Sequence, residues 1–295
     1  MAASSLVERV HRVRELAHSR GDTPVPVAEK PTLAKVIQLP LWPEPARGTP
    51  NAWLRGALFA AVQGKDRRAL KRELLATVEG FEIRFTGWQL DQSDLDVWET
   101  LVHLVRQHGI GEKVEFTAHA LLKALGRSTG KSDHEWLKDV FARLYTAGVE
   151  VTSDNLTFAG TLLSFIRVET TGHYVVWLEP RLLNLYQAGW TQIEWREREA
   201  LRRKPLALWL HGWYASHAKP YPIKIETLHR LCGSYNKDIY GFKRQLATAL
   251  DDIKAVGIID AWEIIGDLVH VERNPTASQQ KHIEKKARAN RKLKR

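Results

Sequence analysis

The sequence predicts a mixed α+β fold in which one arrangement of helices and strands occurs twice. Each half of the chain contains a helix, a short helix, a turn, a longer helix and then a β-hairpin. The glycines that end the short and the long helix lie 22 residues apart in one half (Gly126, Gly148) and 24 in the other (Gly233, Gly257). This repeat is typical of two winged helix-turn-helix domains in tandem. We expect a disordered N-terminal segment before them and a basic tail after them.

Residues 1–50 are predicted to form the flexible N-terminal segment. Seven of the twelve prolines lie between residues 21 and 50, a density that prevents a continuous helix or central strand. Residues 274–295 are predicted to form the basic tail, because they contain eight Lys or Arg and one Glu. Non-specific attraction to phosphates is the use that we expect for this tail.

The N-terminal segment contains the peptide Gln38-Leu39-Pro40-Leu41-Trp42, which resembles the short peptides by which bacterial replication proteins bind the sliding clamp of DNA polymerase. In an extended peptide the Gln38 amide can form hydrogen bonds, and Leu41 with Trp42 can fill an apolar pocket. The alternative is that Leu39, Leu41 and Trp42 pack on the protein's own first domain.

The first winged-helix domain is predicted over residues 51–190. Its helices carry apolar side chains at helical spacing, and its strands alternate apolar and charged residues. Thr117 can cap the second helix, and Ser132 with Glu135 forms a capping-box pattern at the start of the third. The predicted elements are strands over 78–87, 149–152, 156–168 and 173–178 and helices over 92–107, 117–126 and 132–148.

The second winged-helix domain, over residues 191–273, repeats this order. Pro205 suits the first turn of a helix, where its missing N–H would have no partner in any case. Gly266-Asp267 predicts a two-residue hairpin turn, because glycine tolerates a positive φ. The predicted elements are helices from Pro205, over 226–233 and over 239–257 and strands over 258–265 and 268–272.

The exposed face of the long helix in the second domain favours DNA binding. At 100° per residue, a set of donor-rich side chains falls opposite or beside the apolar stripe of this helix. Such side chains read base edges and phosphates when a helix lies in the major groove. The set is Lys237, Tyr240, Lys243, Arg244, Gln245 and Thr248, and the stripe is Ile239, Phe242, Leu246, Leu250 and Ile253. The second domain is therefore predicted to be the main reader of DNA.

The corresponding helix of the first domain exposes a mixed set of charges, which includes Lys138 beside acidic residues. Its preceding turn offers Arg127, Ser128 and Lys131 as phosphate contacts. We therefore expect the first domain to contact the DNA backbone or to form dimers.

The net charge of +10 does not by itself indicate a DNA-binding site, because the tail accounts for most of it and residues 51–273 are close to neutral.

No apolar run approaches the roughly 18 residues that a membrane span needs. Cys232 is the only cysteine, so an internal disulfide is excluded, and this fits a reducing compartment such as the cytoplasm. We expect the Cys232 side chain to be buried. The histidines form no ligand-like cluster, so we expect no metal and no cofactor.

The stretch Gly126-Arg127-Ser128-Thr129-Gly130-Lys131-Ser132 looks like a phosphate-binding loop but lacks the required spacing. It has three residues between the glycines where four are needed, and it follows a helical pattern instead of a strand. No cluster of carboxylates or metal-binding histidines indicates a nuclease or relaxase. The protein is therefore not expected to be an enzyme.

Several stretches resemble the TrfA replication initiators of broad-host-range plasmids. The clearest is Leu90-Asp91-Gln92-Ser93-Asp94-Leu95-Asp96-Val97-Trp98, accompanied by Ile83-Arg84-Phe85-Thr86-Gly87, Leu54-Arg55-Gly56-Ala57-Leu58-Phe59 and Asn51-Ala52. The resemblance covers residues 38–273 and leaves the N-terminal head and the basic tail uncovered.

This resemblance implies a plasmid replication initiator that binds repeated origin sequences (iterons) and opens an adjacent AT-rich segment, with single-stranded origin DNA as a further ligand. It implies recruitment of host DnaA, helicase and the sliding clamp, and a balance in which monomers initiate replication and dimers restrain copy number. The alternative is a winged-helix transcriptional repressor with no role in replication, which the fold alone does not separate from an initiator.

Overall fold

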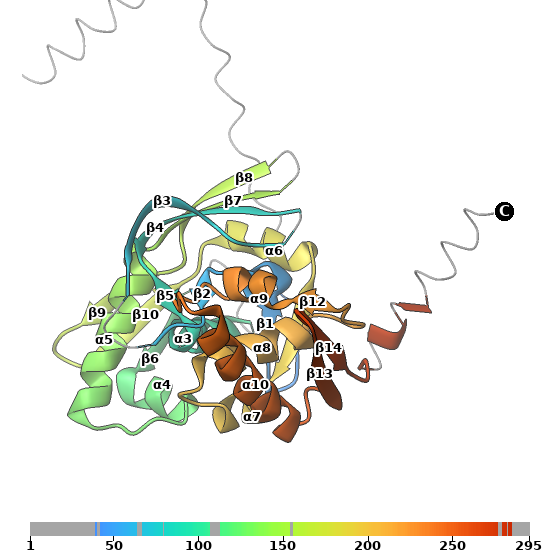
Figure 1. Cartoon of the computed structure of the whole chain (residues 1–295). Coiled ribbons are helices and arrows are strands. Elements are labelled where there is room, and N and C mark those ends of the chain that lie inside the picture. Colours follow the sequence, from blue (N-terminus) through green and yellow to red (C-terminus); the bar gives the residue numbers. More distant parts are fainter. Residues whose placement is uncertain are drawn as a thin grey trace, which may run out of the picture. The chain divides into compact units, whose positions relative to one another are not determined.

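The computed structural model describes residues 39, 42–63, 67–78, 80–106, 113–153, 156–276, 279–281 and 283–284. Helix α3 (Gln92–Val105) lies at its centre and contacts elements from both halves of the chain (Figure 1). The Asp91 carboxylate accepts hydrogen bonds from the backbone N–H groups of Ser93 and Asp94, and the Asp94 carboxylate accepts one from Asp91. This reciprocal cap explains why α3 begins at Gln92, the residue where the sequence predicts it.

The first repeated unit continues from α3 with β6 (Val114–Thr117), α4 (Ala118–Ala124), α5 (Lys131–Thr146), β9 (Ser164–Val168) and β10 (His173–Trp177). Strand β6 pairs with the second strand of the hairpin, so the sheet order is β6-β10-β9. Thr117 caps α4 as predicted, since its hydroxyl accepts a hydrogen bond from the Ala120 N–H at 3.1 Å. The predicted capping box of Ser132 and Glu135 is wrong: α5 follows Gly130 without a side-chain cap.

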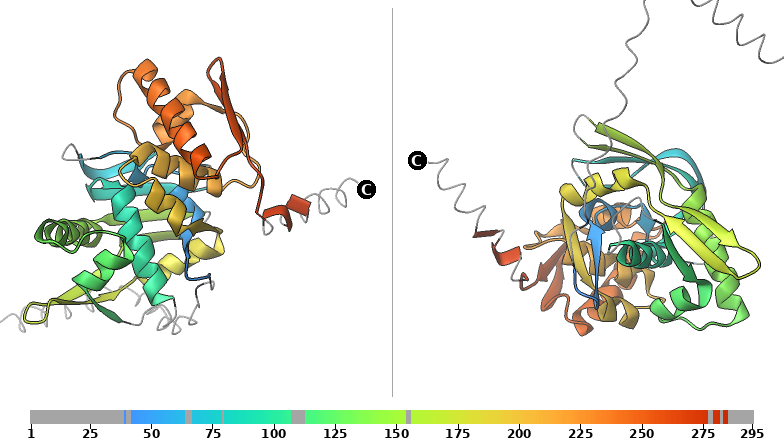
Figure 2. Two further views of the ribbon diagram at one scale, coloured as in Figure 1. Left: turned by 90° about the horizontal axis from the view of Figure 1, so that it is seen from below. Right: turned by 180° about the vertical axis from the view of Figure 1, so that it is seen from behind.

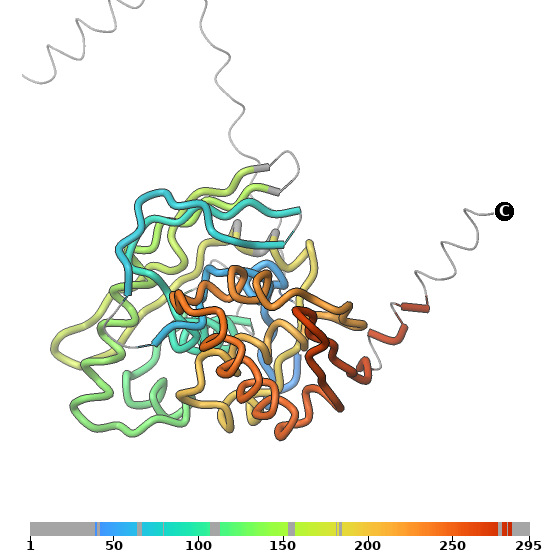
Figure 3. Tube along the Cα trace, in the orientation of Figure 1, coloured from blue at the N-terminus to red at the C-terminus, as the bar shows by residue number. Residues whose placement is uncertain are grey.

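The second repeated unit has the same order of elements. It consists of α8 (Pro205–Ala215), β12 (Ile223–Lys224), α9 (Ile225–Leu231), α10 (Ile239–Ala255), β13 (Ala261–Ile265) and β14 (Leu268–Glu272). Its sheet order, β12-β14-β13, matches that of the first unit. Pro205 occupies the first turn of α8, and Gly266 has a φ of 63° in the hairpin turn, as predicted. The trace in Figure 3 follows this unit as one stretch, from orange to red.

Strands β7 (Gly148–Ser153) and β8 (Leu156–Thr161) interrupt the first unit. The single strand predicted over 156–168 is wrong, because β8 and β9 are separate strands in different sheets. Strands β7 and β8 join β3 (Ala69–Leu75) and β4 (Glu82–Trp88) in an antiparallel sheet of order β3-β4-β7-β8 (Figure 1). The sequence pattern does not predict β3, because three charged residues follow one another in it. Its pairing with β4 also shifts in register between Leu70 and Glu73.

The predicted N-terminal linker ends earlier than residue 50. Residues Ala46–Pro50 form β1, which is buried along its length and pairs antiparallel with β11 (Trp190–Glu194), as the right-hand view of Figure 2 shows. The only proline of β1 is its last residue, so the strand keeps most of its hydrogen-bond donors. The predicted boundary near residue 190 therefore falls in a strand of the folded body, and one hydrophobic core serves both units.

The remaining elements connect these parts. They are α2 (Asn51–Leu54), β2 (Phe59–Ala60), β5 (Leu90–Asp91), a 3-10 helix (Pro180–Leu182), α6 (Leu183–Gln187) and α7 (Trp195–Ala200). The predicted disordered head before residue 39 and most of the basic tail lie outside the described residues.

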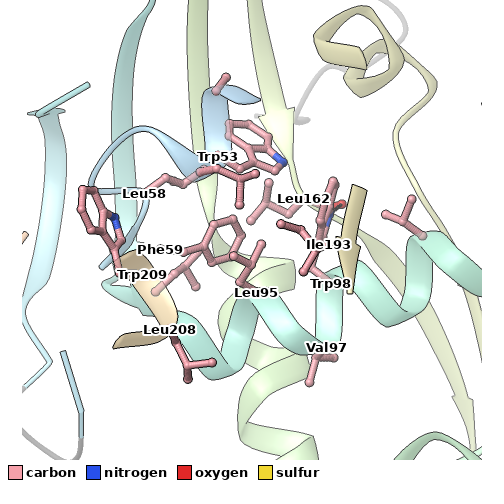
Figure 4. Packing of buried hydrophobic residues seen from close by; sticks show 14 of the residues in the cluster. Trp53, Leu58, Phe59, Leu95, Val97, Trp98, Leu162, Ile193, Leu208 and Trp209 are labelled. Carbon is pink, nitrogen blue, oxygen red and sulfur yellow. Dashed lines mark hydrogen bonds between the residues drawn. The ribbon is translucent and has the colours of Figure 1, made fainter. Parts of the chain in front are cut away.

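The core contains several tryptophans, drawn in Figure 4. Trp53 of α2 meets Trp98 of α3 edge to face, with ring centroids 6.1 Å apart. Trp209 of α8 donates its indole N–H to the Gly56 carbonyl at 3.0 Å. The first helices of both units thus pack on the same N-terminal segment of the folded body.

Trp42 lies in a pocket at the edge of this core and is 4% exposed. Its ring stacks on Tyr186 with centroids 6.2 Å apart, and its indole N–H donates to Nδ1 of His103 at 3.0 Å. Because Nδ1 accepts this bond, the ring proton of neutral His103 is on Nε2, which contacts Glu44 at 3.1 Å. Gly48 leaves room for the indole, since an added Cβ would lie 2.4 Å from Trp42 Cε3.

Burial lowers the pKa of His103 to about 4, and the charges of Arg47 and Arg106 act in the same direction against Glu44. Burial likewise lowers the pKa of His217 to about 4. Both histidines are therefore neutral at pH 7 in the folded protein, and protonating them at low pH destabilises the folded state.

We expect Trp42→Ala to lower the free energy of unfolding by about 3–5 kcal/mol, because it leaves a large cavity under Tyr186. Urea unfolding followed by circular dichroism measures this change. Trp88→Ala is the matched control, since Trp88 is 55% exposed on β4, and it should cost less than about 1 kcal/mol. Equal losses for the two variants would contradict the burial of Trp42.

We expect the protein to lose stability as the pH falls from 6.5 towards 4. The folded-state pKa of His103 is about 4 and its ordinary value is 6.5, so its stabilising contribution is full above pH 6.5 and declines below it. The loss at pH 5 should be about 2 kcal/mol for each such histidine. Urea midpoints at pH 7.5 and 5 should differ less in His103→Asn, whose amide oxygen still accepts from Trp42, whereas exposed His119→Asn should behave as the parent.

Candidate nucleic-acid interface

Helix α10 packs one face against α8 and leaves the opposite face open. Phe242, Leu246, Leu250 and Ile253 are fully buried, as the predicted stripe requires. Ile239 is the exception, because it is 41% exposed and lines a groove next to the hairpin turn instead of the core.

The side chains predicted to read DNA are all exposed on α10 or just before it. They are Lys237, Tyr240, Lys243, Arg244, Gln245 and Thr248. Tyr240 is 79% exposed. Among the described residues, neither Lys237 nor Arg244 forms an ion pair, so both cations are available to a ligand.

The loop before α10 fixes where the helix begins. The Asp238 carboxylate accepts hydrogen bonds from the backbone N–H groups of Tyr240 at 3.0 Å and Gly241 at 2.9 Å. Asp238 in turn donates its N–H to the Asn236 side chain at 3.0 Å, and Nε2 of His229 donates to the Asn236 carbonyl at 2.7 Å. These bonds link the loop to α9 and so fix the position of α9 relative to the start of α10.

A groove of about 550 Å³ separates the start of α10 from the hairpin turn. Lys243 bridges it by donating from Nζ to the Gly266 carbonyl at 3.4 Å. Ile265, which precedes this turn, is 56% exposed. In the left-hand view of Figure 2 the hairpin and α10 lie side by side, so a single ligand could touch both.

The residues predicted to contact phosphates in the first unit are mostly engaged within it. Arg127 lies over the Trp136 ring, 3.6 Å from its centroid, and pairs with Asp133 at 2.8 Å. Ser128 also donates to Asp133, and both bonds hold the pKa of this carboxyl below its usual range. Lys138 pairs with Glu135 at 2.7 Å.

Lys131 is exposed at the start of α5. A phosphate could reach this side chain directly, but it would have to compete with Asp133 for Arg127 and Ser128. The four predicted phosphate contacts of the first unit are thus unequal in their availability.

Two arginines that the sequence pattern does not single out lie beside the turn between α4 and α5. Arg202 donates to the carbonyls of Gly126 and Leu125, the second at 2.8 Å. Arg203 is exposed and has a φ of 65°, a region that non-glycine residues rarely adopt. Both residues line a cavity of about 440 Å³ together with Arg127. Their proximity depends on tertiary packing, which helical periodicity does not reveal.

The clamp-like peptide is partly docked on the folded body. Leu39 and Trp42 are 3% and 4% exposed, which agrees with the alternative that these side chains pack on their own domain. Gln38 and Leu41 lie outside the described residues.

The described part of the chain contains no group of three or more His, Cys, Asp or Glu side chains that could hold a metal ion. Within the same residues, no helix combines the length and the apolar character that crossing a membrane requires. Cys232 is buried as predicted, and burial raises the pKa of its thiol to about 12.

Comparison with solved structures identifies a shared fold. A crystal structure of domains 2 and 3 of RctB, determined on selenomethionine derivatives, has a TM-score of 0.52 and 11% identity, and the match covers 77% of this chain and 99% of that one. A second crystal structure of RctB domains 2–3 has a TM-score of 0.48 and 13% identity, with coverages of 75% and 96%.

Comparison of sequences gives the family. The plasmid replication initiator protein TrfA of Escherichia coli is 27% identical over 242 residues, which are 79% of this chain and 63% of that protein. The match thus spans less than two thirds of the length of the relative. Residues 27–273 match the TrfA protein family over most of the chain. The chain therefore belongs to the TrfA family, to which this plasmid replication initiator gives its name.

Proposed function

We propose that this protein initiates plasmid replication by binding repeated sequences, or iterons, in the plasmid origin. In this proposal both repeated units are winged helices, and α10 of the second unit enters the major groove. The hairpin of β13 and β14 is then the wing that lies beside the same stretch of DNA. Family membership supports the role in replication, and the geometry of α10 supports the mode of binding.

The observation that carries the proposal is the open cationic face of α10. Arg244 projects from a helix whose opposite face is buried, and Lys237 lies in the loop just before that helix; neither is neutralised by a carboxylate among the described residues. A guanidinium on such a face can pair with the O6 and N7 edge of guanine, and an ammonium can neutralise a phosphate.

The first unit is proposed to contact the DNA backbone or to form dimers. The pairing of Arg127 with Asp133 and of Lys138 with Glu135 leaves α5 with little free positive charge. Base reading from this helix is therefore less favourable than from α10, and Lys131 is its most accessible phosphate contact.

Family membership supports a wider role in starting replication at the origin. The protein would open an AT-rich segment, bind the exposed single strand, and recruit DnaA, the helicase and the sliding clamp in the cytoplasm. A monomer–dimer balance would restrain copy number. All these steps are binding events, so the proposal assigns the protein no catalytic step and no cofactor.

Binding of the clamp-like peptide to the clamp would compete with its docking on the folded body. If the clamp takes up Trp42, this side chain must leave its pocket under Tyr186, where it also donates to His103. The free energy of that docking would be subtracted from the affinity for the clamp.

We expect Arg244→Ala to weaken binding to a specific origin duplex by about 1–3 kcal/mol and to affect a random duplex much less, because a guanine contact carries sequence information. Removing residues 274–295 should weaken both duplexes alike and flatten the slope of log affinity against log salt by about 0.9 per phosphate contact. Fluorescence anisotropy titrations at several salt concentrations measure both effects. Equal losses on the two duplexes for Arg244→Ala would make Arg244 a phosphate contact instead.

We expect Tyr186→Ala to strengthen binding to the purified sliding clamp, because this change loosens the Trp42 pocket and leaves the peptide itself unchanged. Trp42→Ala should weaken clamp binding. Surface plasmon resonance on immobilised clamp compares the two variants with the parent. Identical affinities for all three proteins would show that Trp42 is a core residue with no part in clamp binding.

A further inference from the structure

Two apolar side chains are exposed where α10 begins. Ile239 is its first residue and is 41% exposed, and Tyr240 follows at 79%. Ile239 falls on the same helical stripe as the buried Phe242 and Leu246, yet it lines the groove beside the hairpin turn. A single exposed apolar residue needs no explanation, so the surroundings of this pair decide its meaning.

Cations flank the apolar pair along α10, while the carboxylates of Glu226 on α9 and Asp267 in the hairpin turn line the same groove. Lys237 lies two residues before Ile239, and Lys243 and Arg244 lie four residues after Ile239 and Tyr240, on the same side of the helix. An apolar protein partner would have to remove these cations from water without neutralising them, which is costly. A nucleic acid would bring phosphates to the cations and base edges to the apolar pair. The surroundings therefore favour DNA as the occupant.

The position of the pair is fixed. Asp238 caps the helix through the N–H groups of Tyr240 and Gly241, and its carboxylate lies so close to Gly241 that an added Cβ would be 2.7 Å from it. The link from Asn236 to His229 ties this cap to α9. The backbone that carries the pair is therefore fixed before binding, so only the side chains have to be ordered when a ligand binds.

Only one base offers an apolar group in the major groove, namely thymine with its C5 methyl. Against any other base, Ile239 would cover polar edge atoms without replacing their hydrogen bonds to water. We propose that Ile239, together with the ring of Tyr240, contacts a thymine methyl group in the sequence that this chain recognises. The inference rests on the proposed function, because it assumes that α10 reads a specific duplex.

The test uses the full chain and a duplex that this chain itself selects from a random library. Each thymidine of the selected duplex is replaced in turn by deoxyuridine, which lacks only the C5 methyl. We expect one or two replacements to weaken binding about fourfold, the effect of withdrawing one methyl group from an apolar contact. All other replacements should leave the affinity unchanged.

Variants then assign the methyl contact to a residue. Ile239→Ala should weaken binding to the selected duplex by about the same factor and should respond less to deoxyuridine at the sensitive position, because only the Tyr240 ring still contacts the methyl group. Tyr240→Phe should keep the response, because it keeps the ring. Leu74→Ala is the control, since Leu74 is 54% exposed on β3, outside both repeated units, and it should keep both the affinity and the response.

Three results would overturn the inference. The first is a selected duplex that binds more tightly than random DNA but is insensitive to every deoxyuridine replacement. The second is an Ile239→Ala variant that keeps the full response. The third is an Ile239→Ala variant that alters self-association in sedimentation without altering the response, which would assign the pair to a protein contact. If selection enriches no sequence, the proposed function fails, and the inference fails with it.

Discussion

The arrangement of the two repeated units depends on one buried side chain, the guanidinium of Arg198. It pairs with Asp96 of α3 at 2.7 Å, contacts the Gln92 side chain at 3.1 Å, and reaches the Leu208 carbonyl of α8 at 3.4 Å. Arg198 thus joins the first helix of one unit to the first helix of the other. Arg198 also lies 3.7 Å from the buried carboxylate of Glu99, and removing such a partner leaves a buried charge uncompensated, at a cost of about 3–5 kcal/mol. The first helices of the two units are thus joined by a polar contact inside the apolar core that they share.

The same central helix also carries the contacts of α5. The buried carboxylate of Asp94 caps α3 and pairs with Arg143 of α5 at 2.7 Å and with Arg67 at 2.8 Å. Burial raises the pKa of Asp94, with the nearby Asp91 acting in the same direction and the two arginines opposing it. In the first unit, charge is used to fix the packing of helices. In the second unit, Arg244 of α10 forms no ion pair among the described residues, and this is the physical basis of the proposal that this unit reads DNA.

Local chemistry accounts for the part of the fold that the sequence predicts. Apolar spacing predicts the helices of both units, and Thr117, Pro205 and Gly266 act where single-residue preferences place them. Exposure of the α10 residues follows from the helical period alone. The pairing of β1 with β11 depends on residues far away in the chain, so no local pattern reveals it, and for the same reason the sequence offers the docking of Trp42 only as an alternative. Ile239 shows the limit of helical periodicity. It lies on the apolar stripe of α10, but as the first residue of the helix it is 41% exposed.

The pairing of β1 with β11 has a consequence for how the protein is made. The paired residues are up to 148 positions apart, from Ala46 to Glu194. A ribosome adds about 5–20 residues per second, so β1 waits roughly ten seconds or more for its partner strand to be synthesised. During this time β1 and Trp42 can pack on α3, but the hydrogen-bonding edge of β1 has no partner strand. The N-terminal part of the core is therefore completed only after most of the chain has been synthesised.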